Sequence, residues 1–225
     1  MPFLLVGCTP PPLASTVAYQ HQGGKQIALV TPYIPPQESV VSLAPTTVAG
    51  TIGPAFGIVG GLIGGSIEAD AAAKRNKTFT GLLTQDNFSA EPLLATAITK
   101  QLDVEGYTVT RISVPRPQGD FLSPYTPSST PQLDVVLVQL GYYKGGLGAP
   151  YQPMVELKYR LIASNGTTTL AQGAFQYSGM KGDQKPDPQF NYANFADIKA
   201  NPELADKALS AVLTTAGVSV AEGLN

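Results

Sequence analysis

This chain has little of what most catalytic and metal sites are built from. Its 225 residues include one cysteine, one histidine and no tryptophan. A lone cysteine cannot form a disulfide within the chain, and one Cys with one His is too few for an ordinary structural zinc site or a Cys/His nucleophilic pair. His21 lies between two glutamines and is interpreted as a solvated linker residue. We therefore predict no catalytic residue, no metal site and no cofactor.

Charge is scarce as well. Asp, Glu, Lys and Arg make up 13% of the chain, and the formal net charge is −2. Soluble proteins usually contain roughly a quarter of charged residues. Without a basic field to attract phosphate backbones, nucleic acid is not an expected partner. Glycine and proline are abundant instead, with 23 and 20 residues, a composition that fits an envelope protein better than a cytosolic enzyme.

The single cysteine stands in an informative place. Cys8 directly follows Leu5-Val6-Gly7, an apolar run that ends in a small residue. This arrangement resembles the lipobox of Gram-negative outer-membrane lipoproteins, in which the cysteine is acylated. The resemblance implies that Cys8 carries palmitate or a similar lipid and that the domain faces the periplasm or the cell surface. Met1–Leu4 has neither the charge nor the length of a whole signal peptide, so we expect residues 1–8 to be part of a longer one.

A free, partly buried thiol is the alternative for Cys8. The segment that follows, residues 9–45, is rich in proline and favours extended conformations that carry a domain away from an anchor. Within this tether, Gln26–Thr31 is apolar and β-favouring, and Pro32 follows it directly. Because proline lacks the N–H that a central strand needs, the pattern predicts a strand at a sheet edge.

Residues 46–78 form a segment with a regular glycine spacing. Four glycines recur every fourth residue and two more widen the same helix face: Gly53, Gly57, Gly61 and Gly65, with Gly60 and Gly64. Glycine weakens a helix in water by about 1 kcal/mol per residue, so such a stripe predicts close packing or a membrane in compensation. Three interpretations stay open: a spanning helix, a buried helix or loop, and a helix that packs against its own copies or inserts shallowly into a bilayer.

Residues 79–225 have the pattern of an α+β domain. The predicted elements are a helix from Ser89 to Gly106, strands over 107–114 and 133–143, a hairpin of 154–163 with 167–177, and a helix over 202–222. This order favours one mainly antiparallel sheet packed by two helices, preceded by the tether and the Gly-rich helical segment. The arrangement resembles small periplasmic domains of outer-membrane lipoproteins and secretion accessory proteins.

Several local patterns make this prediction specific. Asn165-Gly166 predicts a two-residue hairpin turn in which both residues take positive φ. In Leu133–Tyr143, simple alternation places Gln139 on the same side as Val135 and Leu137, in a central strand. The loop over 115–132, with its prolines and hydroxyl side chains, is either a disordered excursion or a contact surface.

Few residues remain as candidates for a site. Tyr151, Phe190 and Tyr192 lie in predicted loops and are the candidate partner surface, since tyrosine buries area while keeping a polar tip. Asp183 and Asp187 are the best local pair of carboxylates, but their spacing fits no calcium loop and they are interpreted as solvated. The glycines of 145–148 are interpreted as a connection between two strands.

The sequence thus favours a non-catalytic, lipid-anchored envelope protein that acts as a structural or accessory subunit of an outer-membrane assembly in transport, secretion or a surface structure. We expect self-association or contact with other envelope proteins. The alternative is a soluble periplasmic module that binds a ligand or a glycan. A hydrolase whose carboxylates are brought together only by the fold is a third hypothesis.

Overall fold

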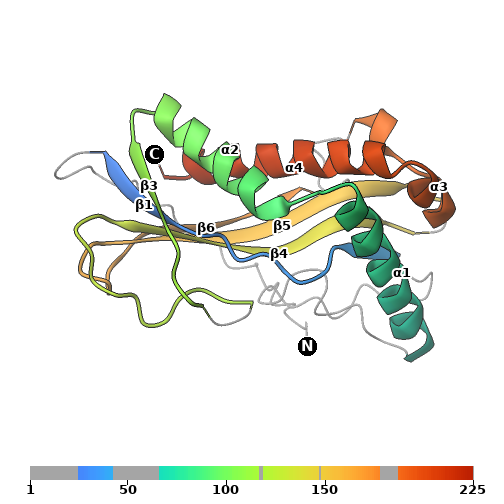
Figure 1. Cartoon of the computed structure of the whole chain (residues 1–225), viewed down its shortest axis with the longest axis horizontal. Coiled ribbons are helices and arrows are strands. Elements are labelled where there is room, and N and C mark those ends of the chain that lie inside the picture. Colours follow the sequence, from blue (N-terminus) through green and yellow to red (C-terminus); the bar gives the residue numbers. More distant parts are fainter. Residues whose placement is uncertain (1–24, 43–65, 117–118, 147, 178–186, 225) are drawn as a thin grey trace, which may run out of the picture.

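The computed structural model describes residues 25–42, 66–116, 119–146, 148–177 and 187–224. These residues form an α+β fold in which a six-stranded sheet is covered on one face by helices (Figure 1). The order along the chain is β1 (Gln26–Val30), β2 (Ser39–Ser42), α1 (Ser66–Gln85), α2 (Ala90–Val104), β3 (Thr108–Ile112), β4 (Gln132–Lys144), β5 (Tyr151–Ile162), β6 (Thr169–Tyr177), η1 (Pro188–Phe190), α3 (Phe195–Ala200) and α4 (Pro202–Glu222). The predicted fold class is confirmed.

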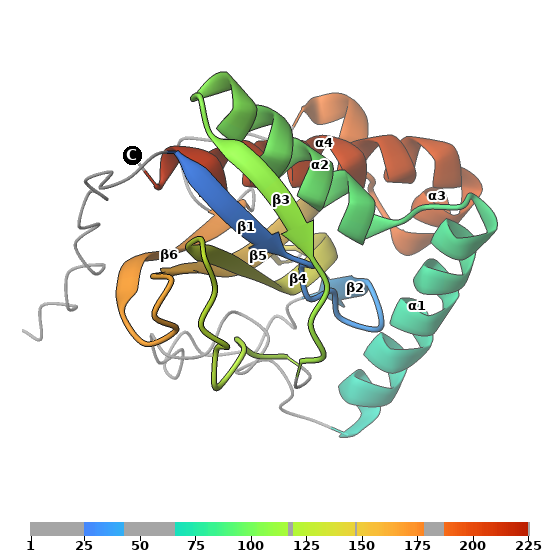
Figure 2. The same ribbon diagram turned by 60° about the vertical axis from the view of Figure 1, so that its left-hand side comes forward.

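The strands lie in the order β3-β1-β4-β5-β6, and β2 pairs with the far end of β4. The longest pairs, β4 with β5 and β5 with β6, are antiparallel. β1 is parallel to its neighbours β3 and β4, and β2 is parallel to β4. β1 lies between β3 and β4, and Figure 2 shows it next to β3. The prediction of an edge strand was therefore wrong. The strand ends before Pro32, so the missing N–H of proline falls outside the ladder.

The predicted segment boundaries also shift. β1 and β2 belong to the sheet although both lie within residues 9–45, the predicted tether. The boundary between residues 78 and 79 falls inside α1, whose Phe79 and Leu83 are each 1% exposed and belong to the core. Cys8 and all glycines of the predicted stripe lie outside the described residues.

α2 and α4 cover the sheet and pack against each other. The predicted stripe of α4 is confirmed: Leu209, Val212, Leu213, Ala216 and Val220 are all buried. The helices approach closely at Gly217, where an added Cβ would stand 2.5 Å from the Cβ of Ala97. On α2, Leu94, Ile98 and Leu102 are buried as predicted, but Leu93 is 36% exposed.

α4 is also long and apolar enough to span a membrane by length and composition alone. Half of that apolar stretch is buried inside the fold, so its hydrophobic character is already used in packing on the sheet and α2. It is the one helix with this property in the part of the chain that the structure describes.

β4 departs from simple alternation. A bulge interrupts its register with β5 between Leu137 and Gln139, so Leu140 returns to the helix-covered face and Gln139 turns to the opposite one. The predicted central position is confirmed, because β4 has partner strands on both sides. The bulge explains why Val138 is 38% exposed within an otherwise buried strand.

The predicted hairpin of β5 and β6 is confirmed, but its turn differs. The backbone N–H of Ala163 donates to the carbonyl of Thr168 at 2.8 Å, so the loop contains residues 164–167 rather than two. Gly166 has φ 75°, whereas Asn165 is absent from the described residues with positive φ. The Asn165 side-chain oxygen instead accepts from the N–H groups of Thr167 and Thr168, at 3.0 and 3.1 Å.

Candidate functional site: a loop clasped to the outer face of the sheet

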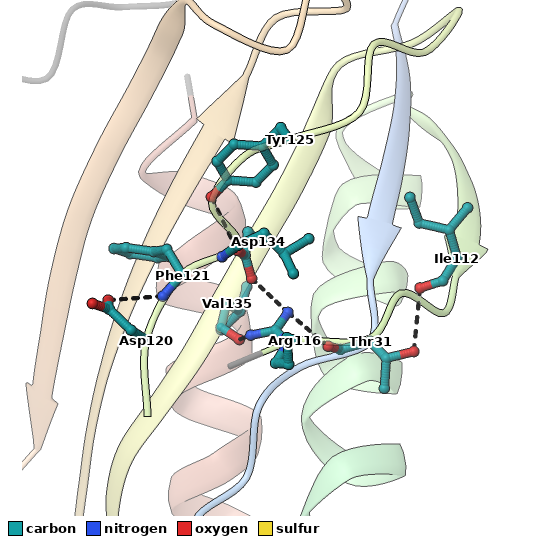
Figure 3. A network of polar contacts seen from close by, with 9 residues as sticks. Thr31, Ile112, Arg116, Asp120, Phe121, Tyr125, Asp134 and Val135 are labelled. Carbon is teal, nitrogen blue, oxygen red and sulfur yellow. Dashed lines mark hydrogen bonds and ion pairs between the residues drawn. The ribbon is translucent and has the colours of Figure 1, made fainter. Parts of the chain in front are cut away.

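The chain between β3 and β4 crosses the face of the sheet opposite to α2 and α4 (Figure 1). We call this face the outer face, and residues 119–131 the outer loop. The sequence of residues 115–132 is compatible with either a disordered excursion or a contact surface. In the structure the outer loop is held in place by a group of buried polar side chains (Figure 3).

Asp134 is the centre of this group. It lies near the start of β4, between Leu133 and Val135, and its side chain is 0% exposed. One carboxylate oxygen accepts from the Arg116 guanidinium at 2.6 Å. The other accepts from the backbone N–H of Leu122 at 2.8 Å and from the Tyr125 hydroxyl at 3.0 Å. A buried carboxylate is tolerated only when it is paired and hydrogen-bonded in this way.

Arg116, which precedes the outer loop, holds the chain after β3 against the end of β1 and the start of β4. Besides Asp134, its guanidinium donates to the carbonyl oxygens of Thr31 at 3.0 Å and Val135 at 3.4 Å. Its side chain is 10% exposed, so the charge is nearly buried with its acceptors. Thr31 in turn donates to the Ile112 carbonyl through both its N–H and its hydroxyl. The cluster therefore links the ends of β1 and β3 to the start of β4.

Tyr125 closes the cluster from the loop side (Figure 3). Burial raises the pKa of its hydroxyl, and the negative charge of Asp134 adds to the increase. The hydroxyl consequently stays protonated and remains a donor to Asp134 throughout the physiological range. We refer to Arg116, Asp134 and Tyr125 as the clasp.

A second set of contacts holds the outer loop on β5. The Phe121 ring lies under two cations, with Lys158 Nζ 4.9 Å and the Arg160 guanidinium carbon 4.4 Å from its centroid. Asp120 accepts from Lys158 at 2.8 Å, and this hydrogen bond lowers the pKa of the Asp120 carboxyl. Asp120 is 68% exposed, so this pair holds the loop far more weakly than the clasp.

The far end of the loop contacts the β5–β6 turn. The N–H of Ser128 donates to the Ser164 carbonyl at 2.9 Å, and an added Cβ on Gly166 would stand 2.8 Å from the Tyr125 carbonyl oxygen. Gln132, which is 3% exposed, donates to the Thr126 carbonyl at 2.6 Å. The four-residue turn of the hairpin thus lies against the outer loop.

The arrangement holds its groups for positioning rather than for reaction. Both carboxylate oxygens of Asp134 are engaged, and the Arg116 guanidinium is shared among three acceptors. Away from Asp120, the outer loop presents to solvent a neutral surface of hydroxyl and pyrrolidine groups, formed by Ser123, Pro124, Thr126, Pro127, Ser128 and Ser129. A fixed surface of this kind suits contact with another macromolecule.

Part of the predicted partner surface was wrong. Tyr151 and Tyr192 are 6% and 5% exposed and belong to the core, and Phe190 is partly buried against it. The cause is a backbone bridge: Tyr151 and Tyr192 exchange N–H to carbonyl hydrogen bonds at 2.7 and 3.0 Å. This bridge extends the sheet, and the Tyr192 ring packs edge-on against Tyr142 with centroids 5.4 Å apart.

The other candidates fall in various places. Asp187 is exposed and caps η1 by accepting from the N–H of Gln189 at 3.0 Å, whereas Asp183 and His21 lie outside the described residues. The segment containing Gly145 and Gly148 connects β4 to β5, as expected. Among the described residues, His, Cys, Asp and Glu side chains form no group of three that could hold a metal ion.

A second feature is a polar concavity of about 670 Å³ between the end of α1 and the start of α4. It is lined by Gln85, Asp86, Asn87, Glu203, Asp206, Lys207 and Ser210. Asn87 has φ 60°, which turns the chain sharply between α1 and α2. One carboxylate oxygen of Asp86 is buried without a hydrogen-bond partner. The lining offers amide, carboxylate and hydroxyl groups to a polar ligand.

Sequence reasoning missed the clasp, although a signal for it was present. Asp134 is the one charged residue within the apolar run Leu133–Leu140, and a charge in a central strand requires a buried partner. Arg116 is the nearest cation upstream in the chain. Which cation pairs with Asp134 depends on the path of the loop, and spacing alone does not define that path.

A comparison with protein families found no matching family model, and a comparison with curated proteins found no matching sequence. Among solved structures, a Xanthomonas campestris protein described by the family model DUF330 is 10% identical, with 88% of this chain and 81% of that chain covered and a TM-score of 0.43. A PelC dodecamer from Paraburkholderia phytofirmans is 14% identical, with 94% and 95% covered and a TM-score of 0.33. Because these values are low, the fold assignment rests on this chain's own strand order and helix packing.

Proposed function

We propose that this protein is a non-catalytic, lipid-anchored envelope protein that serves as a structural or accessory subunit of an outer-membrane assembly. The observation that carries the proposal is Leu5-Val6-Gly7-Cys8, the lipobox-like sequence, followed at once by a proline-rich segment. A lipid on Cys8 supplies the anchor, and the folded domain supplies the surfaces that contact partners.

The fold is compatible with such an anchor. Gln26, the first residue of β1, is 18 residues beyond Cys8 (26 − 8). A fully extended chain of that length spans at most about 60 Å, so the sheet stays near the membrane surface. The anchored domain can therefore contact other proteins of the same membrane without a further linker.

The clasp supports a role in recognition. A buried carboxylate, a nearly buried guanidinium and a partly buried tyrosine hydroxyl hold the outer loop in one position. Buried charges cost free energy unless fully paired, and in some proteins they fix one conformation rather than add stability. Here that conformation is the path of the outer loop, which fits a protein-contact surface.

Membrane fractionation tests the anchor. The chain is expressed with its native upstream region, and its distribution between membrane and soluble fractions is compared for the wild type, Cys8→Ser and the neighbouring control Thr9→Ser. We expect the wild type and Thr9→Ser in the membrane fraction and Cys8→Ser in the soluble fraction. Equal membrane retention of all three chains would remove the lipid anchor from the proposal.

The glycine stripe has its own test within the same proposal. If Gly57 and Gly61 lie on a helix face that packs against copies or a bilayer, substituting both with leucine prevents the close approach. We expect Gly57→Leu with Gly61→Leu to lower the oligomer size of the lipid-bearing chain in detergent. An unchanged oligomer size would exclude the stripe from this role.

A soluble ligand- or glycan-binding module is the second candidate, and the concavity between α1 and α4 is the observation that favours it. Its amide and carboxylate lining suits the hydroxyl groups of a sugar. Cell-wall glycan fragments added to the purified chain would then raise its thermal midpoint, and Asp206→Ala with Asn87→Gly would abolish the increase. No increase at millimolar fragment concentration rejects this function.

A further inference from the structure

Three strands of the described sheet have a partner strand on one side only: β2, β3 and β6. Such an edge offers unpaired N–H and carbonyl groups, and proteins commonly protect it against pairing with another chain. The three edges of this sheet differ in how they are protected.

The free side of β2 is covered by α1. The Asn76 side-chain oxygen accepts from the N–H of Val40 at 2.7 Å. One position before the strand, the Thr80 hydroxyl accepts from the N–H of Glu38 at 3.1 Å. Side chains of a helix thus take the place of a neighbouring strand, and this edge is closed.

The edge at β3 is protected by its length and its charge. The strand has five residues, Arg111 is exposed on it, and Pro115 follows soon after. Short length, a cation and a nearby proline are all known means of preventing strand addition. A second chain would gain few hydrogen bonds here.

β6 has none of these protections among the described residues. It runs for nine residues, Thr169–Tyr177, without a charged residue or a proline. Gln172 and Ala174 are exposed on its outer face, and Phe175 is only partly buried on the helix-covered face. A bulge disrupts its pairing with β5 near Leu170, so regular strand geometry begins at Ala171. Within the described part of the chain, this edge has no partner strand from Ala171 toward Tyr177.

The sequence of this edge is complementary to itself. In an antiparallel pair of two β6 strands centred on Gly173, Phe175 of one copy lies opposite Ala171 of the other, on the helix-covered face. On the outer face, Gln172 lies opposite Ala174. Within residues 171–175, each larger side chain thus meets a small one, and no like charges are opposed. Gly173 itself must stay small, because an added Cβ would stand 2.5 Å from the Tyr159 hydroxyl.

Nearby charges do not oppose this arrangement. Lys158 and Arg160 are the β5 neighbours of Ala174 and Gln172, and both already contact Phe121. In the paired arrangement the two β5 strands are three strand spacings apart, about 14 Å. That separation exceeds the Debye length of about 10 Å at 0.1 M salt, so repulsion between the copies is screened.

We propose that β6 is the surface through which two copies of this chain pair, antiparallel about Gly173, into one continuous sheet. The partner is a second copy because the edge is neutral and matches its own reversed sequence in side-chain size. The interface is small, so the dimer is weak and reversible in solution. The inference deepens the proposed function and rests on it in one respect: a lipid anchor would concentrate the copies at a membrane, where a weak dimer can form.

Sedimentation equilibrium of the full chain carrying Cys8→Ser tests the pairing without any lipid. We expect a monomer–dimer equilibrium for this chain, and at least a tenfold higher dissociation constant after Gln172→Lys with Ala174→Lys, which opposes like charges across the axis. An equimolar mixture with the Gln172→Glu, Ala174→Glu chain should restore the dimer as a mixed species. Thr110→Lys, the matched control on the exposed β3 edge, should leave the equilibrium unchanged.

Cross-linking tests the register. Two variants are prepared in the Cys8→Ser background, one with Gln172→Cys and the other with Ala174→Cys. A mixture of the two should form a disulfide-linked dimer on mild oxidation by diamide, because directly opposed residues of antiparallel strands have Cα atoms about 4.5–5.5 Å apart. Neither variant alone should cross-link, since like residues are then diagonal neighbours. A monomer at all concentrations, or a dimer that the charge variants leave intact, would overturn the proposal. If the wild-type chain forms this dimer but carries no lipid on Cys8, the pairing proposal stands and the lipid anchor is rejected.

Discussion

The two faces of the sheet are held by different physical means. On the inner face, α2 and α4 bury apolar side chains such as Leu137, Leu157 and Leu213, each 0% exposed. On the outer face, the clasp of Arg116, Asp134 and Tyr125 fixes a loop with hydrogen bonds and one buried ion pair. Apolar packing is tolerant of exchange, whereas a buried charge requires particular partners. The inner face is therefore held by apolar contacts that tolerate exchange, and the outer face by one specific set of partners that positions the outer loop.

The largest effect is expected from removing the charge at the centre of the clasp. Asp134→Asn leaves the Arg116 guanidinium nearly buried and unpaired, and losing one partner of a buried pair typically costs about 3–5 kcal/mol. Urea unfolding should show that the free energy of unfolding falls by this amount. The exposed carboxylate Asp120, changed to Asn, is the control and should cost far less. A loss at Asp134 no larger than at Asp120 would break the contrast between the two faces.

A substitution on the inner face should cost somewhat less and leave the outer loop in place. Leu213→Ala removes a fully buried side chain of α4, with an expected loss of about 2–4 kcal/mol. Limited proteolysis under native conditions should cut the outer loop no faster than in the wild type, whereas Asp134→Asn should accelerate cleavage there. Leu93→Ala, at an exposed position of α2, is the control for both measurements. Rapid cleavage of the outer loop in Leu213→Ala would show that the two faces are not separable.

Tyr125 links stability to alkaline pH. Tyr125→Phe removes one hydrogen bond to Asp134 and should cost about 1 kcal/mol at pH 7. Because the pKa of Tyr125 is raised in the folded protein, the unfolded chain loses the proton first, so stability is complete below about pH 10 and falls as pH rises above it. The fall between pH 9 and 11 should be shallower in Tyr125→Phe than in the wild type. Parallel curves would mean that Tyr125 does not remain protonated in the fold.

The smallest effect belongs to the exposed end of the loop. Lys158→Ala removes the ion pair with Asp120 and a cation near Phe121, and exposed pairs contribute at most about 1 kcal/mol. Since the pKa of Asp120 is lowered, this contribution is present above its usual pKa and is lost as the solution is acidified below about pH 4. High salt should reduce the difference between wild type and Lys158→Ala at pH 7. A difference above 2 kcal/mol would place the main attachment of the loop at Lys158 rather than at the clasp.

Local patterns predicted most of the fold. The helix after Ser89, the helix from Pro202 and the β5–β6 hairpin all follow from helical or alternating spacing with recognisable ends. The two corrections in the sheet have non-local causes. β1 becomes internal because β3, some 80 residues later, pairs along its free side, and the bulge at Val138 reverses the side on which Gln139 lies. Neither the pairing with β3 nor the bulge can be predicted from the residues adjacent to it in the sequence.

The site was harder to predict than the fold. Tyr151 and Tyr192 occupy segments that are rich in turn-forming residues, yet a bridge between their backbones draws both rings into the core. The clasp joins residues from β4 and from a proline-rich loop, and only the path of that loop brings Arg116 to Asp134. A charged residue inside an apolar strand was the available signal, because its burial demands a partner from elsewhere in the chain.

The most direct test of the proposed function is the intact mass of the mature protein, isolated from cells that express it with its complete upstream region. The lipid-anchor account predicts a chain that begins at Cys8 and carries the added mass of a diacylglyceryl group and a fatty acid. The modification should be absent from Cys8→Ser. A chain that retains the residues before Cys8 and has an unmodified thiol would contradict the account.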